Sequence, residues 1–219
     1  MKLKNSWKII PVIIMIFAIP MAFLGSVSVQ TILHETIRNL YFHVTMWFSM
    51  FILFIVSLVN AIAYLNSEKE IYDHRSSMYA KTSLLFGFIG IFTGMVWANF
   101  TWGAPWVNDP QLNGAAITIL SYLAYFVLRN SIIDAKKKAR ISAVYNIFAF
   151  TLMFVLIGLL PRINDSLHPG KGGNPGFGSY DLAPTMRPVF YLSIIAWTIV
   201  GVWISVLQIK ILKKQLLKK

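Results

Sequence analysis

The chain has 219 residues, of which 57% are hydrophobic and 13% are charged, and its formal net charge is +12. With a mean hydropathy of +0.63, this composition excludes an ordinary soluble domain and is typical of a polytopic membrane protein. The sequence contains no cysteine, which excludes thiol–disulfide exchange, thiolate metal sites and covalent attachment of a prosthetic group through a C-x-x-C-H motif.

Six apolar segments each approach or exceed the roughly 20 residues that a helix needs to cross a bilayer. The basic start MKLKNSWK and the first apolar run imitate a signal peptide, but no small-residue cleavage site follows. We therefore expect this run to be retained as the first span. The sequence predicts a single all-α membrane domain over residues 1–219 with six transmembrane helices. These lie near residues 9–29, 40–65, 79–97, 113–130, 142–161 and 187–210.

The distribution of Lys and Arg predicts the orientation of these spans. Sixteen of the 20 basic residues lie at the two termini and in the connections that follow the second and fourth spans. The remaining four are Arg38, Arg162, Lys171 and Arg187. Because basic residues are retained on the cytoplasmic side, both termini are expected in the cytoplasm. The other connections then lie on the outer, periplasmic face of the cytoplasmic (inner) membrane.

Histidine and tryptophan collect on the predicted outer face. His34, His43 and His168 lie on or near that side, whereas His74 lies in a cytoplasmic connection. His43 begins the second span in RNLYFHVTMW, and Trp47 follows four residues later, so both share one face of a helix. The segment WANFTWGAPWVNDPQLN, between the third and fourth spans, adds Trp97, Trp102 and Trp106.

These residue types suit a large planar ligand with a metal at its centre. Indoles stack on such a ligand, imidazoles bind the metal from opposite sides, and arginines pair with carboxylates at its rim. Iron porphyrin meets all three requirements, so we predict a haem site in the outer-face loops. The alternative is that the tryptophans form an interfacial belt and the histidines are ordinary polar residues at helix ends.

Other functional classes fit the sequence less well. A membrane b-type cytochrome usually places pairs of histidines inside its helices, and the predicted span interiors contain none. HETIR at residues 34–38 begins like the zinc-protease motif H-E-x-x-H, but Arg38 replaces the second ligand. A cofactor-free scaffold or transporter subunit remains an alternative, although transporters usually keep ionisable residues near the middle of the membrane.

The segments TGMVWANFTWGAPWVNDPQLN and RNLYFHVTMW resemble the tryptophan-rich haem-handling motif, the WWD signature, of cytochrome c biogenesis proteins. The length, the six spans and a histidine on each side of the motif are most similar to the haem exporter protein C (CcmC) family. The motif positions that match are Trp97, Trp102, Gly103, Trp106 and Asp109.

This resemblance implies a haem-binding platform at the outer face, with haem b carried as a transient cargo. His43 and His168 correspond to the axial ligands of the haem iron, and the sequence around His43 favours it over His34. The ring is expected to lie against the motif tryptophans, beside Trp47, whereas Asp109 shapes the loop or contacts a partner.

Three residues depart from the motif of that family. Asn108 stands where another tryptophan is usual, and Gln111 stands where a basic residue is common. Asn113 replaces threonine, and either residue can cap the start of the fourth span.

The resemblance also implies partners. They are a membrane-anchored haem chaperone (CcmE-like), which receives the haem, and subunits of an ABC-type complex (CcmA/CcmB-like). We therefore expect a binding and transfer protein rather than a conventional enzyme. The loop HPGKGGNPGFGSYDLAP is rich in glycine, so His168 could leave the iron while His43 stays on its helix.

Overall fold

The computed structural model describes residues 3–28, 34–168 and 182–218, and within these ranges it contains helices and no strand. Six of the described helical segments are long and apolar enough to cross a membrane, which confirms the predicted fold class. The long helices are α1 (Ile9–Leu24), α2 (Val44–Ser67), α3 (Glu70–Trp102), α4 (Pro110–Ser131), α5 (Ala135–Met153) and α7 (Arg187–Leu216). The short elements are the 3-10 helices η1 (Leu3–Lys8) and η2 (His34–Tyr41), the π-helix η3 (Phe154–Leu159) and α6 (Leu160–Ile163).

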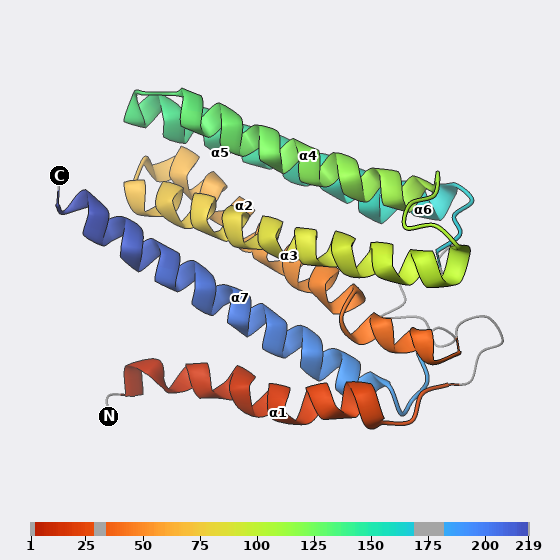
Figure 1. Ribbon diagram of the computed structural model, residues 1–219. Helices are drawn as coiled ribbons and strands as arrows, with labels where there is room; N and C mark the ends of the chain where they lie inside the picture. Colours follow the sequence, from red (N-terminus) through yellow and green to blue (C-terminus); the bar gives the residue numbers. More distant parts are fainter. Residues whose placement is uncertain (1–2, 29–33, 169–181, 219) are drawn as a thin grey trace.

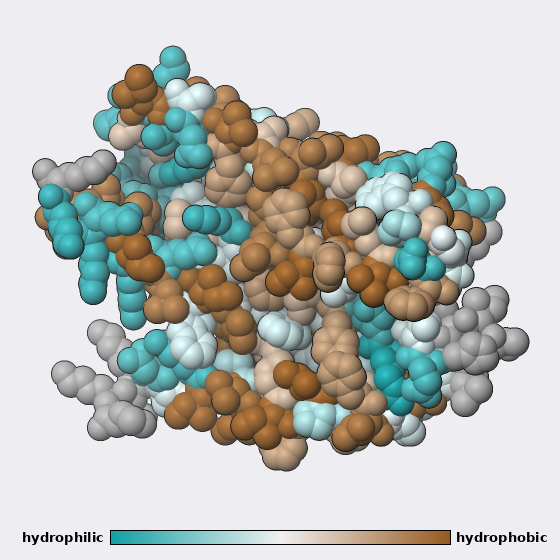
Figure 2. Space-filling view, viewed as in Figure 1, coloured by the Kyte–Doolittle hydropathy of each residue, from teal (hydrophilic) through white to brown (hydrophobic). Residues whose placement is uncertain are grey.

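The helices form three layers in which α2 and α3 lie between the α4–α5 pair and the α1–α7 pair (Figure 1). The two ends of the chain and the turns α2–α3 and α4–α5 share one end of the bundle. The α3–α4 loop, η2 and α6 lie at the opposite end. A predominantly apolar band separates two more polar ends on the surface (Figure 2). The segments that the charge distribution assigns to the cytoplasm therefore lie together.

The end of α3 differs from the sequence prediction. Helix α3 continues to Trp102, so Trp97 and Trp102 belong to a helix, and only residues 103–109 form an irregular loop. Gly103 ends the helix with a φ of 79°, in the left-handed region that glycine adopts without a Cβ clash. The expected cap at Asn113 is wrong, because Asp109 caps α4 and Pro110 takes its first position.

Helix α3 packs closely on α2 through small residues. Gly87, Gly90 and Gly94 lie at helical spacing on the face of α3 that meets α2, and we call this set the glycine face of α3. A Cβ at any of them would come within 3.0 Å of a neighbouring side chain. The facing side chains are Met50 and Trp47 of α2 and His43, which precedes α2, and Gly87 also meets Ile119 of α4. Small residues allow such close helix approach in membranes, where packing drives association.

A buried polar network joins α2, α3, α4 and α5 in the interior. The Asn146 amide donates to the hydroxyls of Ser57, at 2.8 Å, and Ser76, at 3.0 Å. The hydroxyl of Tyr122 donates to the Asn146 carbonyl oxygen at 3.3 Å. All four side chains are buried. Asn146 is therefore the residue through which the four helices share hydrogen bonds.

We expect Asn146→Leu to lower the free energy of unfolding by about 1–3 kcal/mol, because it leaves buried hydroxyl groups without their partner. Unfolding in detergent, followed by circular dichroism, measures this loss. Thr151→Val is the matched control, since Thr151 is exposed on the same helix and donates only to the carbonyl of Ile147. Equal stability of the Asn146 and Thr151 variants would contradict the prediction.

Candidate functional site

Polar and aromatic side chains gather at the end of the bundle that lies opposite the termini. They come from three segments: the start of α2, the last turns of α3 with the following loop, and the residues after α6. The sequence predicted site residues in all three. In the structure they form two adjoining groups along α3, one around His43 and one around His168.

His43 precedes the first residue of α2 and its ring lies on the glycine face of α3. The imidazole Nδ1 is 2.8 Å from the carbonyl oxygen of Gly90. A Cβ on Gly94 would come within 2.6 Å of the ring carbon Cε1. The Trp47 ring meets the imidazole edge-on with centroids 6.3 Å apart, as expected from their spacing of four residues.

These contacts define which ring nitrogen of His43 is available. A carbonyl oxygen only accepts, so Nδ1 carries the proton and donates to Gly90. Nε2 then has a free lone pair, which is the form in which a neutral imidazole binds a metal. The arrangement therefore orients His43 as a ligand through Nε2.

His168 lies against the two indoles at the end of α3. Its ring centroid is 6.3 Å from that of Trp97 and 5.2 Å from that of Trp102. The two indoles pack edge-on with centroids 5.1 Å apart. Only 15% of the His168 side chain is exposed, and Nδ1 is 3.5 Å from an Asp109 carboxylate oxygen. The second predicted ligand therefore shares one cluster with two of the predicted motif tryptophans.

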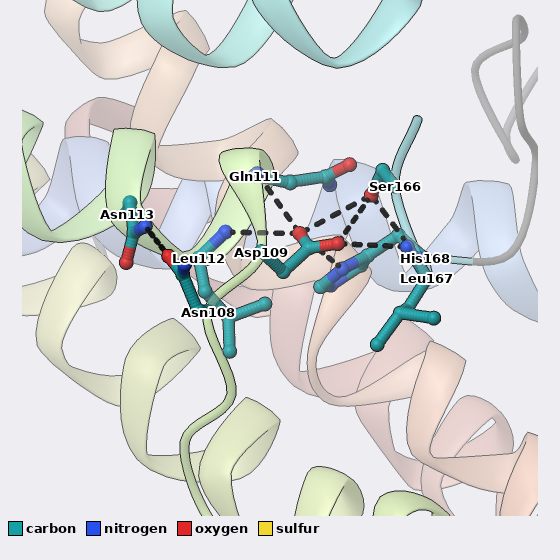
Figure 3. Close-up of polar contacts among 8 residues, drawn as sticks. All are labelled: Asn108, Asp109, Gln111, Leu112, Asn113, Ser166, Leu167 and His168. Carbon is teal, nitrogen blue, oxygen red and sulfur yellow. Dashed lines mark hydrogen bonds and ion pairs between the residues drawn. The ribbon is translucent and has the colours of Figure 1, made fainter. Parts of the chain in front are cut away.

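Asp109 is the centre of the polar contacts in this cluster (Figure 3). It is 1% exposed and accepts hydrogen bonds from the backbone N–H of Gln111 (2.9 Å) and Leu167 (2.7 Å). The Ser166 hydroxyl donates to it at 2.9 Å. Burial by itself would raise the pKa of the Asp109 carboxyl, but these hydrogen bonds lower the pKa below its ordinary value. Burial lowers the pKa of His168, an effect that Asp109 only partly offsets, so the imidazole is neutral at neutral pH.

The remaining predicted residues lie around these groups. Trp106 is in the loop between α3 and α4 with 38% of its surface exposed, and it takes no part in the ring contacts above. Nothing lies within 4 Å of a Cβ placed on Gly103. The side chain of His34 and the glycine-rich loop over residues 169–181 lie outside the described residues. The preference for His43 over His34 as the ligand, and the release of His168 through this loop, therefore stay predictions.

The arginine nearest to His43 in sequence is used for another purpose. Arg38 donates through Nη1 to the carbonyl oxygens of Ala22, at 3.1 Å, and Gly25, at 2.7 Å. Its Nε donates to the carboxylate of Glu35 at 2.6 Å. This guanidinium satisfies carbonyl groups at the end of α1, as basic residues near helix C-termini often do.

Sequence reasoning missed Gly90, Gly94 and Ser166. The two glycines had a detectable signal, because their spacing on α3 matches that of Trp47 and His43 on α2. Ser166 had no signal of its own, since its partner Asp109 is 57 residues away in the chain.

Within the described residues, no group of three His, Cys, Asp or Glu side chains is placed to hold a metal ion. A bare ion would need more ligands than two imidazoles.

Comparison with known proteins relates the chain to a family. Residues 1–163 match the family described as Cytochrome C assembly protein. Similar curated proteins carry the name cytochrome c biogenesis protein CcsA. One from Thermosynechococcus vestitus is 54% identical over 41 residues, which cover 19% of this chain and 13% of that protein. One from Prochlorococcus marinus is 33% identical over 82 residues, which cover 36% of this chain and 26% of that protein.

A third, from Fagopyrum esculentum, is 28% identical over 132 residues, covering 60% of this chain and 38% of that protein. The aligned parts thus span at most 38% of the length of these three relatives.

Proposed function

The chain belongs to the cytochrome c assembly protein family, and we propose that it binds haem between His43 and His168 and hands it on during cytochrome c assembly. The observation that carries this proposal is the orientation of the two imidazole rings. Each presents Nδ1 to an oxygen, at 2.8 Å for His43 and 3.5 Å for His168, which leaves Nε2 of each ring for a ligand.

The ligand chemistry favours a porphyrin over a bare ion. Porphyrin supplies four nitrogen ligands in one plane, and two imidazoles complete the coordination of its iron from opposite sides. Within the described residues, no group of three His, Cys, Asp or Glu side chains is placed to hold a bare ion. Trp97 and Trp102 provide the apolar, aromatic surroundings that a flat macrocycle needs. Trp106, which is partly exposed in the adjacent loop, adds a further indole.

Haem is a cargo in this proposal, so the site must hold it and also release it. His43 packs on the glycine face of α3 and immediately precedes the long helix α2. His168 follows the short α6 and belongs to an irregular segment. We assign permanent ligation to His43 and exchangeable ligation to His168, whose place on the iron a ligand from the acceptor takes.

The predicted orientation puts this site on the outer side of the cytoplasmic membrane, which is the periplasmic side in a bacterium with two membranes. Positive charges gather at the opposite end, where both termini lie (Figure 1). A haem at the outer end is accessible to the compartment in which cytochromes c are completed.

The proposed function requires an acceptor for the haem. The resemblance to haem exporter protein C implies transfer to a CcmE-like haem chaperone, with CcmA/CcmB-like subunits alongside. The relatives reported above carry the name CcsA, so they support the wider family and do not single out that branch. We retain the haem chaperone as the proposed acceptor and apocytochrome c as the alternative.

The first test is a titration of the purified, detergent-solubilised protein with haem b, followed by absorption spectroscopy. The expected result is one haem per chain with the spectrum of low-spin iron bound by two histidines. Adding purified chaperone or apocytochrome then shows which one takes the haem. No binding to the folded protein would support the scaffold alternative. Reversible reduction of the bound haem by quinol would favour a b-type cytochrome.

Gly94→Ala tests the position of His43 without removing a ligand. The new methyl group would lie 2.6 Å from Cε1 of His43, so the imidazole must move away from α3. We expect the affinity for haem to fall by about 10–100-fold, the range for residues that support a metal ligand. Equilibrium titration of the variant with haem measures the change.

Gly158→Ala is the matched control for this prediction. A Cβ there would meet only the ring of Phe154, at 3.6 to 3.9 Å, which is ordinary contact. Its haem affinity should equal that of the wild type. Wild-type affinity in the Gly94 variant would show that His43 does not bind from this position.

A further inference from the structure

We propose that Asp109 is a positioning residue that acts through His168, holding the imidazole so that Nε2 is presented to the haem iron. This inference rests on the proposed function, because it assigns a task to Asp109 only if His168 is a ligand. The sequence offered two expectations for Asp109, shaping the loop or contacting a partner, and this inference develops the first. With 1% of its surface exposed, Asp109 is not available to a partner protein.

The carboxylate of Asp109 holds the segment that carries His168 at several points. It accepts the backbone N–H of Leu167 at 2.7 Å and the hydroxyl of Ser166 at 2.9 Å. The Ser166 oxygen in turn accepts the backbone N–H of His168 at 3.1 Å. Three consecutive residues are thus tied, directly or through one hydroxyl, to one side chain that is more than 55 residues away in the chain.

The same carboxylate is itself fixed by α4. Its oxygen Oδ1 accepts the N–H groups of Gln111, at 2.9 Å, and Leu112, at 3.4 Å, as the cap of that helix. The backbone carbonyl of Asp109 accepts the N–H of Asn113 at 3.0 Å. Figure 3 shows the bonds from Gln111 and Leu112 on one side of Asp109 and residues 166–168 on the other. The position of His168 is therefore set relative to a long helix, although His168 itself lies in an irregular segment.

The orientation of the imidazole follows from the same arrangement. Nδ1 of His168 has no hydrogen-bond partner among the described residues and faces Asp109 at 3.5 Å. This separation exceeds that of a strong hydrogen bond, so the hold on the segment comes mainly through Ser166 and Leu167. The carboxylate still favours the ring orientation that turns Nδ1 toward it. Carboxylate partners fix the ring of many metal-binding histidines in this way.

Two substitutions separate positioning from helix capping. Asp109→Asn keeps the size of the side chain and an equally good helix cap, but its amide nitrogen cannot accept the hydrogen bonds of Ser166 or Leu167. Asp109→Ser keeps a helix cap, but its side chain is shorter and has a single oxygen. That oxygen caps α4 and leaves residues 166–168 without their hydrogen-bond acceptor. Asn108→Ala is the matched control, because Asn108 belongs to the same loop and its side chain accepts from Asn113 at 2.8 Å.

The experiment measures haem b affinity and the spin state of the ferric iron in the purified full chain. We expect Asp109→Ser to lower the affinity by about 10–100-fold and to convert low-spin iron to high-spin iron. Asp109→Asn should lie between Asp109→Ser and the wild type. Added imidazole should restore the low-spin spectrum in both variants, because only the sixth ligand is misplaced. A general structural defect would not be reversed by imidazole. Asn108→Ala should behave as the wild type.

Failure of the inference is distinguishable from failure of the proposed function. Low-spin spectra and wild-type affinity in both Asp109 variants, while His168→Ala produces high-spin iron, would overturn the role of Asp109 alone. Absence of haem binding by the folded wild type would overturn the function and the inference together. An unchanged low-spin spectrum in His168→Ala would likewise remove the ligand on which the inference rests.

Discussion

His43→Ala is expected to lower the affinity for haem by more than about 100-fold, which is above the range for residues that only support a metal ligand. His43 is the ligand with the firmer support, since its ring is held by the carbonyl of Gly90 and packs against Gly94. Without it, the haem would depend on His168, which belongs to an irregular segment. Haem titration and the ferric absorption spectrum measure the loss.

His168→Ala should have a smaller effect on affinity and a clear effect on the spectrum. The iron keeps His43 and loses its second imidazole, so low-spin iron becomes high-spin, and added imidazole restores the low-spin form. Transfer to an acceptor should become faster, because one bond to the iron no longer has to break. A low-spin, wild-type spectrum in either histidine variant would contradict ligation by that residue.

His74→Ala provides the matched control for both substitutions. His74 lies in the first turns of α3, at the end of the bundle away from the site. Its removal should change neither the haem affinity nor the spectrum. A loss of haem in this variant would show that histidine substitutions act through the fold rather than through ligation.

The number of spans was predictable from the sequence because it depends on the length of apolar segments alone. The end of α3 was not predictable in the same way. A helix of 33 residues is about 50 Å long, whereas the apolar layer of a bilayer is about 30 Å thick. Hydropathy detects only the part within that layer, so the predicted span ended at residue 97 and Trp102 was placed in a loop although it belongs to the helix.

The candidate site was predictable where it depends on local spacing. His43 and Trp47 share a helix face, and the structure confirms that their rings meet. The contact of His168 with Trp97 and Trp102 depends on packing between distant segments. The sequence placed these residues on the same outer face but could not show that their rings meet. The cap of α4 was misplaced because Asp109 and Asn113 are both good capping residues, and tertiary contacts of Asp109 decide between them.

Arg129→Met is expected to lower the free energy of unfolding by about 3–5 kcal/mol, because it leaves the Asp73 carboxylate without its counter-charge in a largely buried position. The two side chains are each 12% exposed and form two parallel hydrogen bonds of 2.6 Å between α3 and α4. The two hydrogen bonds of such a bidentate pair are well aligned and strong. Much of the energy that they supply, however, only offsets the cost of burying the two charges. Unfolding in detergent measures the loss.

The exposed pair between Arg140 and Glu68 supplies the comparison. The charged atoms of this pair are 3.9 Å apart and its side chains are 74% and 62% exposed, so Arg140→Met should lower the free energy of unfolding by less than about 1 kcal/mol.

Adding Asp73→Leu to Arg129→Met should recover most of the stability, since no unpaired charge then remains buried. The Arg129–Asp73 pair lies at the end of the bundle away from His43 and His168. Haem bound to the folded Arg129 variant should therefore keep its low-spin spectrum. An equal loss of stability in the Arg129 and Arg140 variants would contradict the dependence on burial.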